Sequence, residues 1–240
     1  MPQPKSVSLS TGQAVALPLD TRAQITGVVL PGDLARARER LPDGLAPVRV
    51  APDRAGLVLL SVDYRRIGDD AMAPYDEVGV FLAATPSGGP VPEFGALRLG
   101  LGLGVGAYTV ALPVTTEPAR ALGEVWGYPK TVRDISITRS EGRRRTTVGD
   151  ADDPDIELDL PFAPRFVGTV GAASFTDGDG LRRQPLTLRG AFGVHPFAGR
   201  VSAGEGRLAE LLGDLDPGRP LASLSFDGRF VIDPNERLVP

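Results

Sequence analysis

Short stretches in which hydrophobic and polar residues alternate recur along the whole chain, separated by turns rich in glycine and proline. Alternation with a period of two is typical of strands that bury one face. The strands predicted in this way cover residues 24–30, 48–51, 56–64, 77–84, 131–138, 143–148, 156–160, 165–171, part of 186–201, and 221–232. Residues 1–20 are weakly patterned, and we expect an arm or an edge strand there. Pro31-Gly32 is expected to turn the chain after the first of these strands.

Three short helices are predicted between the strands. Asp33 can accept a hydrogen bond from the first turn of a helix over residues 34–41, which is rich in alanine, arginine and glutamate. Thr116 can cap a second helix over residues 116–125, and a third is expected over residues 205–212. Many short strands and few helices indicate a mainly β chain of the α+β kind, antiparallel, folded as a barrel or a sandwich.

Residues 97–109 contain an unusual alternation of apolar residues (Leu97, Leu99, Leu101, Leu103 and Val105) with glycines (Gly100, Gly102, Gly104 and Gly106). The glycine spacing differs from that of a dinucleotide-binding Gly-x-Gly-x-x-Gly loop, and the residues that follow are typical of a strand rather than of a helix. We therefore reject a nucleotide site here. Glycines on one face of a strand more often allow another element to pack closely, or leave space inside a barrel.

The composition excludes several classes of function. With 240 residues, 42% hydrophobic and 23% charged, the chain has the size and balance of one soluble globular domain over residues 1–240. A net charge of −4 gives no basic surface for nucleic acid or for an anionic membrane, and no apolar run is long enough to span a bilayer. A cytoplasmic location is the default expectation. The chain has no cysteine and one histidine, His195, so we expect no metal site and no Ser-His-Asp catalysis.

The lysine usage singles out one candidate reactive group. Nearly all positive charges are arginines, and the two lysines are Lys5, near the N-terminus, and Lys130. An arginine stays protonated in proteins, whereas a lysine amine can lose its proton and attack a carbonyl carbon. Trp126 and Tyr128 precede Lys130 and can wall off a small pocket. Lys130 is therefore interpreted as a reactive amine; the alternative is a solvated lysine on a surface turn.

Two segments carry a family resemblance. Residues 124–130 read Glu-Val-Trp-Gly-Tyr-Pro-Lys, and residues 74–80 read Pro-Tyr-Asp-Glu-Val-Gly-Val. The first resembles the segment around the Schiff-base lysine of the acetoacetate decarboxylase family, and the second resembles the Pro-Tyr-x-Glu segment of the same family. Their order and their separation by roughly fifty residues also suit that family.

The resemblance implies a fold and a chemistry. The fold would be a single-domain, antiparallel, cone-like β-barrel with about three short helices, usually assembled as a homo-oligomer. Lys130 would lie inside and form an imine with a small keto acid, and Glu77 would face it as an acid, a base or an orienting group. Because the imine accepts the electron pair of the broken bond, neither a metal nor an organic cofactor is expected.

The resemblance also implies further pocket residues. The family carries an arginine from an early strand near the glutamate, and Arg22 is the nearest match. Tyr75, Trp126 and Tyr128 would shape the pocket. Glu124 would either line the pocket or finish the preceding helix.

Two positions depart from the family pattern. Thr131 stands where decarboxylases commonly have a second lysine, and Gly123 stands where they commonly have an arginine. These departures bear more on decarboxylation than on imine formation. The leading hypothesis is a lyase that decarboxylates a β-keto acid through Lys130. The alternatives are an aldolase-dehydratase or a cyclase that acts on a pyruvate-like keto acid through the same imine, and a barrel that binds a small ligand without turnover.

Overall fold

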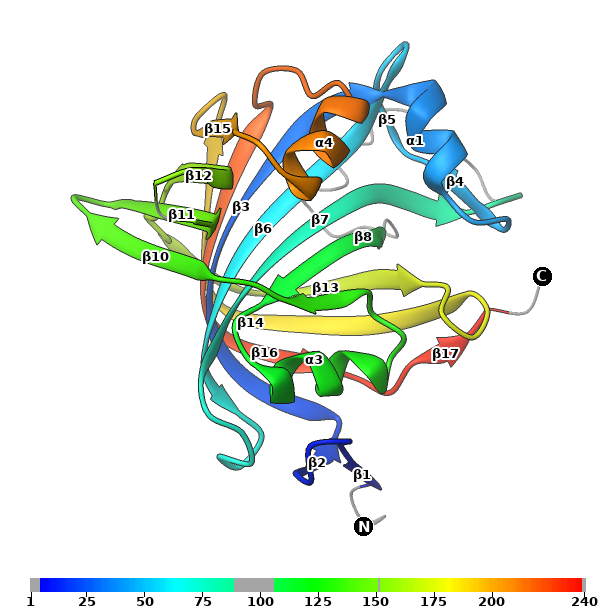
Figure 1. Ribbon diagram of the computed structural model, residues 1–240, viewed down its shortest axis with the longest axis vertical. Coiled ribbons are helices and arrows are strands. Elements are labelled where there is room, and N and C mark those ends of the chain that lie inside the picture. The colour runs from blue at the N-terminus through cyan, green and yellow to red at the C-terminus, as the bar shows by residue number, and fades with distance from the viewer. Residues whose placement is uncertain (1–4, 89–105, 151, 239–240) are drawn as a thin grey trace.

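The computed structural model describes residues 5–88, 106–150 and 152–238 (Figure 1). Most of these residues lie in two sheets and an N-terminal hairpin of β1 (Lys5–Ser8) and β2 (Ala14–Leu17). The mainly β class predicted from the alternation is confirmed. The interpretation of residues 97–109 falls largely outside the described residues. None of the described helices has the length and hydrophobicity needed to cross a membrane.

The larger sheet has eleven strands. In order across it lie β4 (Leu45–Pro47), β7 (Tyr75–Pro86), β6 (Arg54–Ile67), β3 (Leu19–Asp33), β16 (Ala222–Ile232), β14 (Arg182–Pro196), β13 (Phe166–Thr176), β8 (Gly106–Val114) and β9 (Lys130–Val132), while β5 (Arg49–Ala51) pairs with β6 and β17 (Glu236–Arg237) with β14. Strand β8 also pairs with β7, so the path of hydrogen-bonded strands returns on itself and encloses an interior. Most pairs are antiparallel; β8 is parallel to β13 and to β9.

A smaller sheet covers the outside of this ring. It consists of β10 (Ile135–Ser140), β11 (Arg143–Gly149), β12 (Pro154–Pro161) and β15 (Arg200–Ala203). Its apolar side chains, such as Ile156 and Leu158, pack with those of β3, β6 and β7, such as Leu30, Leu57 and Val80, in one buried cluster. The other face of these three strands turns to the interior. Burial on both faces explains why their sequences are almost continuously hydrophobic.

The described residues contain three helices, α1 (Leu34–Arg40), α3 (Glu117–Glu124) and α4 (Arg207–Asp214). Asp33 caps α1 by accepting a hydrogen bond from the Arg36 N–H, and Thr116 caps α3 by accepting one from the Ala119 N–H. Both caps agree with the sequence analysis. The third helix begins two residues later than predicted.

The turn expected at Pro31-Gly32 is wrong. Strand β3 continues through both residues to Asp33, where Pro31 and Gly32 lie opposite Gly56 and Ala55 of β6. On the other side of β3, pairing with β16 has already ended at Val29. A proline is tolerated at this point because no neighbouring strand needs its missing N–H.

The single strand predicted over residues 131–138 is two strands. Strand β9 pairs with β8 in the larger sheet, and β10 pairs with β11 in the smaller one. Arg133 and Asp134 carry the chain between them, with backbone hydrogen bonds to Val114 in one direction and from Gly149 in the other. The interruption at these two residues marks a change of sheet.

Candidate active site

The ring of strands encloses a cavity of about 280 Å³. Its walls come from β3, β6, β7, β8, β13, β14 and β16, and its lining is almost entirely aliphatic and aromatic. Among the residues that the structure describes, Glu77 and Lys130 are the charged ones in this lining. Pockets of this size and character are the usual sites of small-molecule binding.

The strand register brings Glu77 and Lys130 together. On one side of β8, Val114 lies opposite Glu77 of β7, and on the other side Leu112 lies opposite Lys130 of β9. Because Leu112 and Val114 are two residues apart, they share one face of β8, and their partners project to the same side.

The two side chains form a buried ion pair. Lys130 Nζ lies 2.7 Å from Glu77 Oε2, and the side chains are only 5% and 8% exposed. The distance is that of an ion pair, but its angles are not those of a hydrogen bond, so Oε2 has no aligned donor among the described residues. Lys130 Nζ also lies 3.4 Å from the Tyr75 hydroxyl and 5.3 Å from the centre of its ring.

Aromatic side chains surround this pair. The rings of Tyr64 and Tyr75 are 4.6 Å apart, and the Tyr128 hydroxyl is hydrogen-bonded to Ser174 of β13. Trp126 is held through its carbonyl oxygen, which accepts a hydrogen bond from the Thr176 hydroxyl. Its buried indole N–H has no partner among the described residues.

The electrostatics of the cavity keep its tyrosines protonated. Burial raises the pKa of Tyr64 and of Tyr75 well above the ordinary value, and the negative charge of Glu77 raises both further. Burial also raises the pKa of Tyr128, where the hydrogen bond with Ser174 opposes the effect and Glu77 adds to it. All three hydroxyls can therefore donate a hydrogen bond over the whole physiological pH range.

Gly123 lies directly beneath the lysine. A Cβ atom on Gly123, the penultimate residue of α3, would lie 2.5 Å from Cδ and 2.7 Å from Cγ of Lys130. Real Cβ atoms do not approach other atoms so closely, and the side chain of Lys130 therefore passes over the bare backbone of the helix. The absence of a side chain at residue 123 gives the lysine its path to Glu77.

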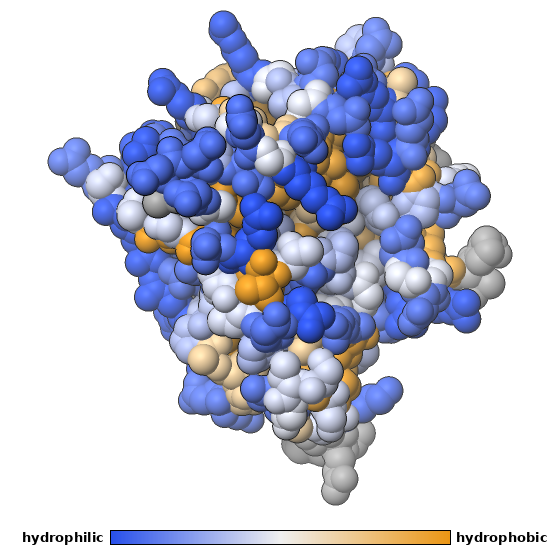
Figure 2. Space-filling model, viewed as in Figure 1, coloured by the Kyte–Doolittle hydropathy of each residue, from blue (hydrophilic) through white to orange (hydrophobic). Residues whose placement is uncertain are grey.

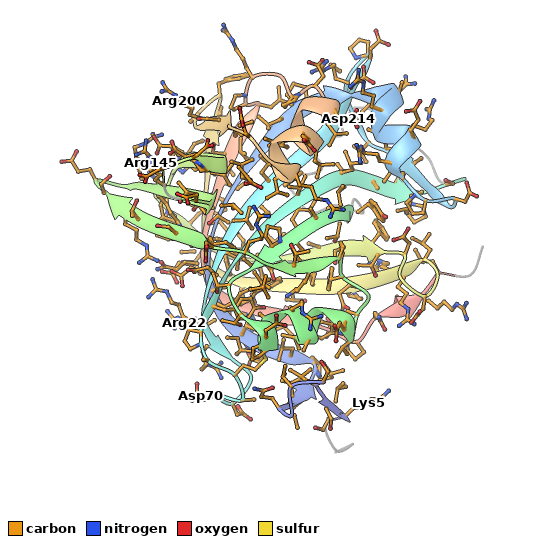
Figure 3. The ribbon with its side chains drawn as sticks, in the orientation of Figure 1. Lys5, Arg22, Asp70, Arg145, Arg200 and Asp214 are labelled. Atoms are coloured by element: carbon orange, nitrogen blue, oxygen red, sulfur yellow. The ribbon has the colours of Figure 1, made fainter. Side chains whose placement is uncertain are left out.

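The structure does not bring Arg22 or Glu124 to the cavity. The Arg22 side chain is 66% exposed, lies 3.9 Å from Asp227 and projects from the outside of the ring (Figure 3). Alternation along β3 turns Ala23 inward in its place, next to a register shift. The Glu124 side chain is half exposed and pairs with Arg120 on the same helix. Tyr75, Glu77, Trp126, Tyr128 and Lys130 all line the cavity, and their roles stay predictions.

The sequence analysis did not identify several other walls of the cavity. These are Tyr64 of β6, Ser174 of β13 and the inward residues of β14 and β16. A signal for the last was present, because Leu224, Phe226, Phe230 and Ile232 share one phase of alternation. It predicted an apolar face but not what that face encloses. No three His, Asp or Glu side chains within the described ranges gather as metal ligands.

Comparisons with known proteins agree with this architecture. The sequence model of the acetoacetate decarboxylase family matches residues 1–157, a stretch that contains both Glu77 and Lys130. No curated protein sequence matches the chain.

Solved structures share the fold at low sequence identity. The enduracididine biosynthesis enzyme MppR, complexed with the condensation product of pyruvate and imidazole 4-carboxaldehyde, has a TM-score of 0.66 at 15% identity over 98% of this chain and 97% of that one. Acetoacetate decarboxylase from Legionella pneumophila has a TM-score of 0.65 at 13% identity over 100% and 92%. An acetoacetate decarboxylase-like enzyme from Sphingomonas wittichii RW1 has a TM-score of 0.58 at 16% identity over 92% of each chain. Since the family model covers well over half of its residues, the chain belongs to the acetoacetate decarboxylase family.

Proposed function

We propose that the protein is an enzyme that forms a Schiff base between Lys130 and a keto acid, and that it decarboxylates a β-keto acid. The observation that carries the proposal is a buried lysine amine 2.7 Å from a buried carboxylate, inside a cavity with otherwise uncharged walls. Taking two charges out of water is costly, and nothing in the fold requires a lysine on β9. Such a pair is typical of a functional site.

Glu77 is placed to manage the protons of imine formation. Transfer of a proton from Nζ to Oε2 leaves a neutral amine, which attacks the keto carbon of the substrate. The carbinolamine then loses its hydroxyl group as water, with a proton returned by Glu77, and an iminium remains. The hydroxyl of Tyr75 and the indole N–H of Trp126 can donate to substrate oxygens during these steps.

The iminium accepts the electrons that decarboxylation releases. The bond between the α-carbon and the carboxylate breaks, CO₂ leaves, and the electron pair forms an enamine with the former imine nitrogen. Protonation of the α-carbon restores an iminium, and water releases the ketone and the lysine. The apolar walls assist the bond cleavage because they disfavour the charged carboxylate relative to neutral CO₂.

An aldol condensation with dehydration, or a cyclisation, is the second candidate, with a pyruvate-like keto acid as the substrate. Thr131 follows the reactive lysine where a second lysine is common in decarboxylases. One structural neighbour is an enzyme solved with a condensation product of pyruvate. Both reactions begin with an imine on Lys130. In decarboxylation the enamine forms as CO₂ leaves and then takes up a proton, whereas in the condensation it forms by loss of an α-proton and attacks a second carbonyl carbon. The third candidate is a protein that binds a small ligand without turnover.

Borohydride trapping tests the proposal. The protein is incubated with acetoacetate or with pyruvate, reduced with borohydride and mapped by mass spectrometry. We expect a reduced adduct on Lys130 and none on Lys5, which is the other lysine of the chain and therefore an internal control. Lys130→Arg should give no adduct, because arginine keeps the positive charge without a nucleophilic amine.

CO₂ release then separates the candidates. Release from a β-keto acid supports decarboxylation, whereas an adduct with pyruvate without CO₂ release supports the condensation chemistry. A chain that binds keto acids but forms no adduct with any of them is a binding protein, and the proposed function is then wrong.

A further inference from the structure

The cavity is longer than a small keto acid requires. Ser174 and Phe166 both line it and lie eight residues apart on β13, and Leu224 and Ile232 are equally far apart on β16. A strand rises by about 3.3 Å per residue, so the cavity follows roughly 25 Å of each strand. Its volume of about 280 Å³ corresponds to the liquid volume of about nine water molecules.

Paired apolar side chains line much of this length. Strands β14 and β16 lie side by side, and their register places four pairs of cavity residues opposite one another: Leu186 with Ile232, Leu188 with Phe230, Phe192 with Phe226, and Val194 with Leu224. Val170 of β13 lies opposite Leu188 and extends the same face. These pairs form an apolar wall along β14 and β16, interrupted at its middle by the glycine pair Gly190 and Gly228.

The two ends of the cavity differ. Lys130 and Glu77 lie at a buried end, where Tyr128 is bonded to Ser174. At the other end of β13 and β14, Phe166 is 53% exposed and Val194 is 45% exposed, although both line the cavity. A substrate held at Lys130 therefore has its reactive carbonyl deep inside, and the rest of the molecule extends toward the exposed end.

The apolar lining contrasts with the face of the molecule shown in Figure 2. On the face shown in Figure 2, most of the surface is hydrophilic, with small separate apolar patches. The long apolar lining therefore lies mainly in the interior. Beyond Lys130, the described lining residues offer no cation that would bind a second negative charge on the substrate.

We propose that the substrate is a carbonyl compound with an elongated, uncharged apolar chain, namely a medium- or long-chain β-keto acid. The inference rests on the proposed function for its carbonyl chemistry, while its apolar chain follows from the cavity alone. A three- or four-carbon keto acid leaves the apolar wall of β14 and β16 uncovered. A chain of about eight to ten carbons extends along part of this wall and gains the free energy of removing its methylene groups from water.

A homologous series of substrates tests the chain length. The wild-type protein is assayed for CO₂ release with acetoacetate, 3-oxohexanoate, 3-oxooctanoate and 3-oxodecanoate. Burial of one methylene group predicts a rise in kcat/KM of about fourfold, and we expect at least a hundredfold gain across the series. Equal or falling values of kcat/KM with chain length would overturn the inference and leave the proposed function standing.

A blocking variant locates the chain. Val170→Phe places a ring across the middle of the cavity, and we expect the ratio of kcat/KM for 3-oxodecanoate to that for acetoacetate to fall at least tenfold. Thr169→Phe is the matched control, because Thr169 is the adjacent residue of β13, is exposed and does not line the cavity. It should leave the ratio unchanged. A ratio that is the same in both variants would contradict the proposed path of the chain.

A binding measurement that needs no imine separates the two proposals. The double variant Glu77→Leu with Lys130→Met cannot form a Schiff base and leaves no unpaired buried charge, so we expect its apolar walls to stay intact. By calorimetry, we expect 2-nonanone, the product of 3-oxodecanoate decarboxylation, to bind this variant at least a hundredfold more tightly than acetone. If the wild type traps no keto acid but this preference holds, the proposed function fails and the apolar ligand stands. If 2-nonanone does not bind either protein, the inference is wrong.

Discussion

Gly123 is the residue that most directly controls where the Lys130 amine lies. A Cβ at this position would lie 2.5 Å from Lys130 Cδ, so Gly123→Ala must push the lysine side chain away from Glu77. We expect borohydride trapping and kcat to fall at least tenfold. Stability should change by less than about 1 kcal/mol, because the helical preference of alanine over glycine offsets the displacement. Rapid-quench trapping together with urea unfolding checks both parts.

Gly213 provides the matched control for this prediction. It is the penultimate residue of α4, as Gly123 is of α3, and a Cβ there meets no atom within 4 Å. Gly213→Ala should leave trapping unchanged and stabilise the protein by about 0.5–1 kcal/mol. If Gly123→Ala traps keto acid as fast as Gly213→Ala does, the lysine does not depend on the bare helix backbone.

The ion pair between Lys130 and Glu77 should cost stability when only one partner is removed. Glu77→Gln leaves a buried ammonium without its counter-charge, and we expect the free energy of unfolding to fall by about 3–5 kcal/mol. The double variant Glu77→Leu with Lys130→Met removes both charges and should recover most of this loss. Urea unfolding at neutral pH measures the difference.

A surface pair shows what an exposed contact contributes. Arg183 and Glu236 lie 3.3 Å apart with side chains 41% and 62% exposed, so Glu236→Gln should change stability by less than about 1 kcal/mol. A similar small loss in Glu77→Gln would mean that the interior pair is well hydrated, contrary to its burial.

At the scale of the element, helix α3 provides the backbone surface at Gly123 against which the Lys130 side chain lies. Its first turn depends on the Thr116 hydroxyl, which accepts a hydrogen bond from the Ala119 N–H. Thr116→Ala should lower the free energy of unfolding by about 1 kcal/mol, and Thr116→Ser should restore it. Because Gly123 and Trp126 follow on the same segment, we also expect slower trapping at Lys130. Asp33→Ala removes the equivalent cap of α1 and should cost similar stability without slowing the trapping.

The elements that the sequence predicted well are those set by local physics. Asp33 and Thr116 indicate the starts of helices because each side chain accepts a hydrogen bond from a backbone N–H three residues later. These features depend on neighbours in the chain and can be read without knowledge of the fold.

The elements predicted wrongly depend on partners far away in the sequence. Pro31 remains in a strand because β6 pairs with it on one side while β16 has already ended on the other. Arg133 and Asp134 interrupt a strand because one sheet ends there and another begins. The propensities of the residues themselves do not indicate which strands pair with them.

The same distinction applies at the scale of the whole molecule. Two local motifs suffice to single out Glu77 and Lys130, and the structure brings them together across β8. Arg22 was placed by position alone, and one residue of register decides whether its side chain faces the interior or the solvent. The cavity arises only when β13, β14 and β16 close the ring with β8. Its length and apolar character, which suggest the substrate, could not be predicted from either motif.

The buried tyrosines make the stability of the whole molecule sensitive to alkaline pH. The pKa values of Tyr64, Tyr75 and Tyr128 are raised in the folded protein, chiefly by burial, above the value of about 10 expected in the unfolded chain. Above about pH 10 the unfolded chain therefore loses protons that the folded protein retains, and the free energy of unfolding falls as pH rises. This stability is fully present below about pH 10. The three cavity tyrosines correspond to a loss of up to about 4 kcal/mol per pH unit, and Tyr108, whose pKa is also raised, adds to it.

Urea unfolding between about pH 9 and pH 11, followed by circular dichroism and by the ultraviolet absorbance of tyrosinate, checks this prediction. We expect the absorbance of the three buried tyrosines to appear together with the loss of structure. Tyr75→Phe should reduce the cavity's contribution to the pH dependence by about a third, because it removes one of the three cavity tyrosines. Tyr108, whose pKa is raised by partial burial and by Asp177, lies outside the cavity lining and serves as a comparison through Tyr108→Phe. If the tyrosines ionised near pH 10 while the circular dichroism stayed native, water would have to reach the cavity freely. In a cavity filled with water, the Lys130–Glu77 pair would not be desolvated, and an apolar substrate chain would gain less free energy by entering the ring.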